Sequence, residues 1–144
     1  RIYEDLGLWD EACERYEHAL ASGKAVDLRA RVAGRLAALC KRAGRHERAI
    51  ELWRRLTSLG LTGYEPHIEL AKHYEHQLRD YDAALEVVEE ALAIVEIQEL
   101  RRGPHAAADR KALEHRRARL HQKKLRVRGK ADPESASVSI SPTA

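Results

Sequence analysis

The sequence of 144 residues contains no Phe, no Met and no Asn, and aromatic residues make up only 5% of it. Hydrophobic residues still make up 44%, so a core must consist mostly of Leu, Ala, Val and Ile. This composition favours helices and argues against an aromatic-rich β-sandwich or β-barrel. The length fits one domain with room for a short tail.

Cysteine and long apolar runs are also scarce. The two cysteines, Cys13 and Cys40, are too few for the disulfide framework of a small secreted domain, which predicts a reducing, cytoplasmic environment. No run of about 18 apolar residues occurs, because Glu or Arg breaks the longest stretches, and we expect no membrane contact. No signal pattern follows Arg1, so we expect the chain to be processed or to be part of a longer protein.

Charge is distributed unevenly along the chain. Residues 1–100 carry 14 basic and 19 acidic side chains, whereas residues 101–130 carry 12 basic and 2 acidic ones. Residues 131–144 are rich in Ser, Pro and Ala and have no helical periodicity. The pattern predicts a compact acidic body over 1–100, a basic helix over 101–130 and a disordered tail over 131–144.

Three segments of the sequence, 6–20, 43–57 and 78–92, align with one another. In each, a turn precedes an aromatic residue or His, and an Ala and two further contacts follow at the spacing of one helix face. The repeated alanines, separated by 37 and 35 residues, are Ala12, Ala49 and Ala84. The unit is therefore a helical hairpin, close to the period of about 34 residues of tetratricopeptide repeats.

The helix that precedes an aligned segment also has a packing face. This face consists in the second unit of Ala33, Leu36, Ala37 and Cys40, and in the third of Leu70, Ala71 and Tyr74. It resembles the first-helix half of the tetratricopeptide pattern, in which a small residue lets two helices approach closely. The sequence departs from that pattern where His67 replaces the family's Trp, where Ala replaces its Gly, and where one extra residue near Arg79 lengthens a turn.

The first unit lacks the front of its first helix, because Arg1 falls about nine residues into the repeat pattern. Of the apolar face of that helix, only Ile2, Tyr3 and Leu6 remain. We expect an uncovered apolar surface there, and self-association of the chain through it.

Two helices are predicted after the third turn. The first runs from Tyr81 to about Gln98, before a Gly-Pro break, and the last from Ala106 to about Arg128. The last helix has a thin apolar seam, which comprises Leu113, Leu120 and Val127. Its other faces are basic, as suits a helix that covers the end of a solenoid.

The whole pattern resembles that of tetratricopeptide repeat proteins. It predicts an all-α, tetratricopeptide-type helical-hairpin solenoid of about three repeats, the first truncated, stacked right-handedly and closed by a basic C-terminal capping helix. The resemblance implies a protein-interaction module with a protein or peptide partner.

The amino-acid sequences of four segments are similar to the C-terminal region of bacterial proteins in which tetratricopeptide repeats follow an RNase H-like 3′-5′ exonuclease domain. The segments are YEDLGLWDEA (3–12), LCKRAGRHERAIELWRRL (39–56), ELAKHYEHQLRDYDAALE (69–86) and LEHRRARLHQKKL (113–125). In that family the catalytic carboxylates belong to the nuclease domain, which would precede Arg1. The resemblance, over about residues 1–128, therefore implies a non-catalytic accessory region.

Asp80, Asp82 and Glu86 are the nearest approach to a carboxylate cluster for Mg²⁺. The alternative is structural, with Asp80 capping a helix and Asp82 in its first turn. Acidic residues at the same turn of the first unit, Asp10 and Glu11, favour this structural alternative.

A second metal hypothesis places His73, His76 and Glu69 on adjacent helical positions. The alternative is packing, since no metal-binding motif of known spacing occurs. Cys13 and Cys40 fall on or beside packing positions, which favours a structural role over a catalytic one. We therefore expect no catalytic residue, no metal site and no cofactor in this chain.

A mixed-charge groove is expected on the concave side, where the first helices of the hairpins line up. The predicted partner-binding residues are Arg31, Arg35, Lys41, Arg42, Glu65, Glu69, Lys72 and Glu75. They could take a charged peptide or helix by complementary pairing, or form an ordinary solvated face. The lack of Asn excludes the clamp of Lys, Arg and two Asn with which some tetratricopeptide domains hold chaperone C-termini.

The basic C-terminal helix offers a nucleic-acid-binding alternative. Its candidate phosphate contacts are Arg110, Lys111, Arg116, Arg117, Arg119, Lys123, Lys124 and Arg126. Lys and Arg provide sequence-independent affinity for phosphates, although aromatic residues for base stacking are lacking. The competing interpretation is a solvated helix that only caps the solenoid.

Overall fold

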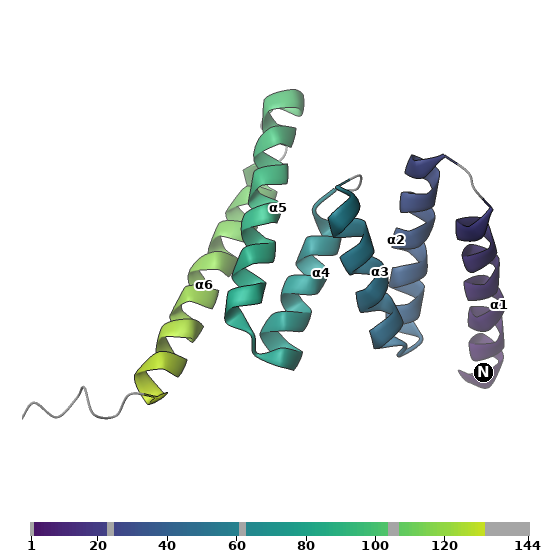
Figure 1. The fold of residues 1–144 in the computed structure, drawn as a ribbon, viewed down its shortest axis with the longest axis horizontal. Helices are drawn as coiled ribbons and strands as arrows, with labels where there is room; N and C mark the ends of the chain where they lie inside the picture. The colour runs from purple at the N-terminus through teal and green to yellow at the C-terminus, as the bar shows by residue number, and fades with distance from the viewer. Residues whose placement is uncertain (1, 23–24, 61–62, 104–106, 132–144) are drawn as a thin grey trace, which may run out of the picture.

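A computed structural model of the chain describes residues 2–22, 25–60, 63–103 and 107–131. Within these ranges the chain forms six α-helices and one π-helical segment, with no strand. The helices follow one another in a single row, and each runs opposite to its neighbour (Figure 1). This arrangement confirms the predicted all-α, tetratricopeptide-like helical repeat fold. Of the predicted disordered tail, all but Ala131 lies outside the described residues.

Two complete hairpins occupy the middle of the row. The first consists of α2 (Val26–Arg42) and α3 (His46–Leu59). The second consists of α4 (Glu65–His73), the π-helical segment η1 (Tyr74–Leu78) and α5 (Tyr81–Arg102). In both, the two helices pack antiparallel to each other, as the aligned segments predict.

The ends of these helices follow from local backbone chemistry. Gly44 and Gly60 adopt positive φ angles of 75° and 62°, which Gly adopts more readily than residues with a Cβ atom, and each stands just beyond a helix. Asp80 begins α5, because its carboxylate accepts a hydrogen bond of 3.0 Å from the amide of Ala83. The structure therefore confirms the predicted capping role of Asp80.

The repeated small residues lie where the paired helices touch. Ala49 and Ala84 are fully buried, and so are Ala37 and Ala71 on the opposing helices. A larger side chain at these positions would hold the helices apart. Two core clusters result, one centred on α2 and α3 and the other on α5 and α6. The repeat register derived from sequence is thus confirmed in both complete hairpins.

The first unit differs from its prediction, because helix α1 (Ile2–Ala21) runs without a break through the turn expected before Trp9. Gly7 keeps a helical backbone, unlike the glycines that end the hairpin helices. Continuing the helix satisfies the backbone hydrogen bonds that a turn would leave open. The side chains of Ile2, Tyr3 and Leu6 fall outside what the structure describes, and Ala12 is only partly buried.

The final helices are longer than predicted. Helix α5 continues four residues past Gln98 to Arg102 and ends at Gly103, whose φ is 76°. Helix α6 (Ala107–Ala131) packs against α5 through Leu113 and Leu120. Val127, predicted in the same seam, is exposed, because α6 extends beyond α5 at that end (Figure 1). No helix in the described part of the chain is long and apolar enough to cross a membrane.

Candidate functional site

A groove of about 1060 Å³ lies between α2 and α4, the first helices of the two hairpins. Trp53 and Leu56 of α3 lie at its floor, where they are almost completely buried, and Tyr16 of α1 adds to its lining. The rest of its apolar lining comprises Leu28, Ala30, Val32, Gly34, Ala38 and Pro66. The groove thus combines an apolar interior with walls formed by two rigid helices.

Six of the eight predicted groove residues line this hollow: Arg31, Arg35, Lys41, Arg42, Glu65 and Glu69. Their positions follow from the helical stripes on α2 and α4 that face each other. The apolar lining was not predicted as part of the site, although Trp53 and Leu56 were recognisable as members of the packing stripe. Tyr16 carries the same signal, because it holds in the first aligned segment the position that Trp53 holds in the second. Leu28 carries no such signal, because its place depends on how the hairpins stack.

Glu69 joins the two walls of the groove. Its carboxylate accepts from Lys41 of α2 at 2.5 Å and from Lys72 of α4 at 3.0 Å. Burial opposes ionisation of Glu69, but the hydrogen bonds from the two lysines outweigh it and hold the pKa below its ordinary value. The Lys41 ammonium also lies 5.9 Å from the ring centre of Trp53, within reach of a cation–π contact. Lys72, which the sequence predicted in the groove, is not part of its lining and contacts it only through the ion pair with Glu69.

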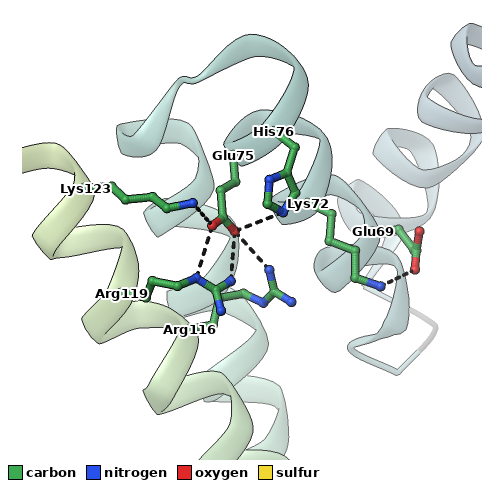
Figure 2. A network of polar contacts seen from close by, with 7 residues as sticks. All are labelled: Glu69, Lys72, Glu75, His76, Arg116, Arg119 and Lys123. Carbon is green, nitrogen blue, oxygen red and sulfur yellow. Dashed lines mark hydrogen bonds and ion pairs between the residues drawn. The ribbon is translucent and has the colours of Figure 1, made fainter. Parts of the chain in front are cut away.

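Glu75 does not lie in the groove, and its predicted place there is wrong. Its side chain is buried under α6, where Arg116 (3.0 Å), Arg119 (3.1 Å) and Lys123 (2.7 Å) surround its carboxylate (Figure 2). Burial opposes ionisation of Glu75, but the hydrogen bonds from Arg119 and Lys123 outweigh it, and the pKa falls to about 2. The Nε2 atom of His76 lies 3.8 Å from the Glu75 carboxylate, and the His76 side chain is exposed.

The π-helical segment η1, which follows α4 directly, carries Glu75. The chain holds one residue more than the repeat pattern in this hairpin, and η1 accommodates it before Arg79 turns the chain with a left-handed φ of 52°. The amide of Asp80 then donates to the carbonyl of Tyr74 at 2.9 Å. Six residues of helix turn the direction of the side chain by about 240°, so Glu69 and Glu75 face different neighbours, α2 and α6.

The basic residues of α6 point mostly towards the hairpin that it covers. In addition to the three around Glu75, Arg110 pairs with Glu99 at 2.8 Å and Arg117 with Glu89 at 3.3 Å. Lys124 pairs with Asp82. Of the eight residues predicted for nucleic-acid binding, only Lys111 and Arg126 make no ion pair within the part of the chain that is described.

Tyr64 adds a further contact between α6 and the second hairpin. Burial and a hydrogen bond to Asp109 raise the pKa of the Tyr64 phenol to about 12. Together with the pairs of Arg110, Arg117 and Lys124, this contact fixes α6 along much of its length.

The other candidate clusters take structural places. Asp82 and Glu86 are exposed on α5, while Glu69 of the His73 cluster is occupied by lysines. Among the described residues, no three His, Cys, Asp or Glu side chains lie together so as to hold a metal ion. Cys13 and Cys40 are buried as neighbours in one core cluster. Burial and the neighbouring Cys13 raise the pKa of the Cys40 thiol, which suits packing rather than nucleophilic attack.

His67, a departure from the repeat pattern, is a buried polar residue. It is 3% exposed, its Nε2 lies 3.4 Å from the Glu90 carboxylate, and its Nδ1 has no hydrogen-bond partner among the described residues. Burial lowers the pKa of His67 despite the nearby carboxylate, so the imidazole is neutral near pH 7. It stands where the tetratricopeptide pattern has Trp, and it lies on α4 outside the groove lining.

Comparison with known proteins points to the same family as the repeat pattern. A family model of the tetratricopeptide repeat matches residues 1–30, which cover α1 and the first turn of α2. Searches of curated proteins and of solved structures found no match.

Proposed function

We propose that this chain is a non-catalytic protein-interaction module that binds a segment of a partner protein in the groove between α2 and α4. The observation that carries the proposal is the groove itself, which has an apolar floor at Trp53 and Leu56 and charged residues along both walls. A site of this kind can bury an apolar anchor and orient it with ion pairs at the rim. The match to the tetratricopeptide repeat supports it, because such repeats generally mediate contacts between proteins.

Nucleic-acid binding through α6 is the weaker alternative. Phosphate binding needs cations that face solvent, and most cations of α6 already neutralise carboxylates of the second hairpin. Breaking those pairs would offset much of the gain from a phosphate contact. The ion pairs therefore support a capping role for α6.

As its setting, we propose that the module is the accessory region of a larger bacterial, cytoplasmic protein with an RNase H-like nuclease domain. The support is the sequence similarity of four segments of this chain to that family. The test is to read the coding sequence upstream of Arg1. Acidic catalytic motifs on strand patterns are expected there, and an upstream sequence without them would overturn this assignment but not the groove.

The groove itself is tested by selecting peptide ligands from a displayed library of helical peptides against the intact chain. Ala38 lines the groove and is exposed, so an Ala38→Trp variant fills the groove without disturbing the core. Ala118 is equally exposed on α6, and Ala118→Trp is the matched control. Selected ligands should lose binding to Ala38→Trp and keep it to Ala118→Trp. Ligands that bind both variants equally would show that the groove is not the site.

A further inference from the structure

The two walls of the groove differ in charge. The α2 wall carries Arg31, Arg35 and Arg42, which are exposed and make no ion pair with any described residue. They stand at the spacing i, i+4 and i+11, on one stripe of the helix. Eleven residues of helix rise by about 16 Å, so three guanidinium groups follow this wall for roughly three turns.

The α4 wall cannot neutralise these guanidinium groups. Its inner carboxylate, Glu69, is already held by Lys41 and Lys72. Only Glu65 remains, and it makes no ion pair in the described part of the chain. The α2 wall thus presents four cations, Arg31, Arg35, Lys41 and Arg42, to the two carboxylates of the α4 wall, Glu65 and Glu69. The excess positive charge of the groove therefore lies on α2.

We infer that the groove binds an acidic amphipathic helix, whose carboxylates pair with Arg31, Arg35 and Arg42. The inference rests on the proposed function and adds to it the chemistry of the partner. Guanidinium groups favour carboxylates because their planar forks can donate two parallel hydrogen bonds to one carboxylate.

The spacing of the three arginines favours a helical ligand over an extended one. A helix lying along α2 repeats its side chains with the same rise, so Glu or Asp at i, i+4 and i+11 can meet all three arginines. The stripe beside these carboxylates would then face the floor at Trp53 and Leu56, where Leu or Ile side chains lose their contact with water. The ligand is therefore defined by an acidic stripe next to an apolar one.

The test uses two designed peptides of about 18 residues with the same Leu stripe. One carries Glu at the positions that face α2, and the other carries Lys there. Binding of each to the full chain is measured by fluorescence anisotropy at low and at physiological salt. We expect the Glu peptide to bind roughly tenfold or more tightly than the Lys peptide, with a difference that shrinks as salt screens the pairs.

Two charge-reversal variants separate the groove from the general charge of the protein. Arg31→Glu/Arg35→Glu should lower the affinity for the Glu peptide by roughly tenfold or more and raise the affinity for the Lys peptide. Lys111→Glu/Arg126→Glu changes the net charge equally, at exposed positions of α6 that form no ion pair with the described residues, and should leave both affinities unchanged. Melting curves of both variants are compared with the parent to show that each is folded.

The outcomes distinguish the two proposals. Equal binding of both peptides that is lost in Ala38→Trp would overturn the acidic preference and leave the groove as the site. The acidic preference would also be overturned, with the groove still the site, if neither peptide binds while the displayed library yields neutral or basic ligands for the groove. If neither peptide binds and the library yields no groove ligand, the proposed function itself fails.

Discussion

At the scale of single residues, Glu75 shows how one carboxylate decides where a helix docks. Removing a charged group from water is costly unless opposite charges and hydrogen bonds compensate. Here Arg116, Arg119 and Lys123 supply both, and all three come from α6 (Figure 2). An apolar residue at position 75 would leave the three cations of α6 facing one another without a counter-charge.

Glu75→Gln should therefore destabilise the protein by about 3 kcal/mol, the usual cost of breaking a buried ion pair by removing one partner. Urea unfolding followed by circular dichroism measures the change. Glu86→Gln, on the exposed face of α5, is the control and should change little. Equal unfolding midpoints for the two variants would show that the cluster does not hold α6.

The same carboxylate predicts an acid dependence of stability. Because the folded-state pKa is about 2, below the ordinary value of 4.5, the contribution of Glu75 is fully present above about pH 4.5 and is lost as the pH falls towards 2. Unfolding free energies of the parent should therefore converge with those of Glu75→Gln over this range. A constant difference between the two proteins from pH 6 to pH 3 would contradict the low pKa.

At the scale of elements, the sequence predicted what depends on local spacing. The period of the alanines placed Ala49 and Ala84 at the helix contacts, since the two helices of a hairpin are neighbours in sequence and in space. It could not place Glu75, whose surroundings depend on η1 and on α6, more than 40 residues further on. Nor could it show that α1 continues through Gly7, because Gly tolerates a helix as well as a turn.

A substitution at a helix contact tests this register. Ala49→Glu should destabilise the first complete hairpin by about 1 to 3 kcal/mol, because a charged side chain would enter a fully buried position. Ala118→Glu, at an exposed position of α6, is the matched control. Thermal melts of the two variants within error of each other would contradict the packing of α3 on α2.

At the scale of the whole molecule, the acidic body and the basic end of the chain are two halves of one contact. The carboxylates Glu75, Asp82, Glu89 and Glu99 belong to the second hairpin, and their cationic partners all belong to α6. Folding therefore pairs six of the twelve basic residues of segment 101–130 with four carboxylates of the second hairpin. The arginine stripe on α2, which is separated from α6 by the second hairpin (Figure 1), has no ion-pair partner among the described residues.

Reversing the basic face of α6 should consequently affect stability more than nucleic-acid binding. Arg116→Glu/Arg119→Glu/Lys123→Glu would place like charges against Glu75, and the melting temperature should fall strongly.

The parent itself should bind single- or double-stranded nucleic acid only weakly at physiological salt, as measured by anisotropy with labelled oligonucleotides. If instead the parent binds tightly, with log K falling by about 0.7 to 0.9 per phosphate contact against log salt, the cations of α6 must leave their carboxylates for phosphates. The triple reversal would then abolish binding, whereas Lys111→Glu/Arg126→Glu would remove only the contribution of Lys111 and Arg126. Because the two variants differ in whether they touch Glu75, their comparison decides between a helix that caps the solenoid and one that binds phosphates.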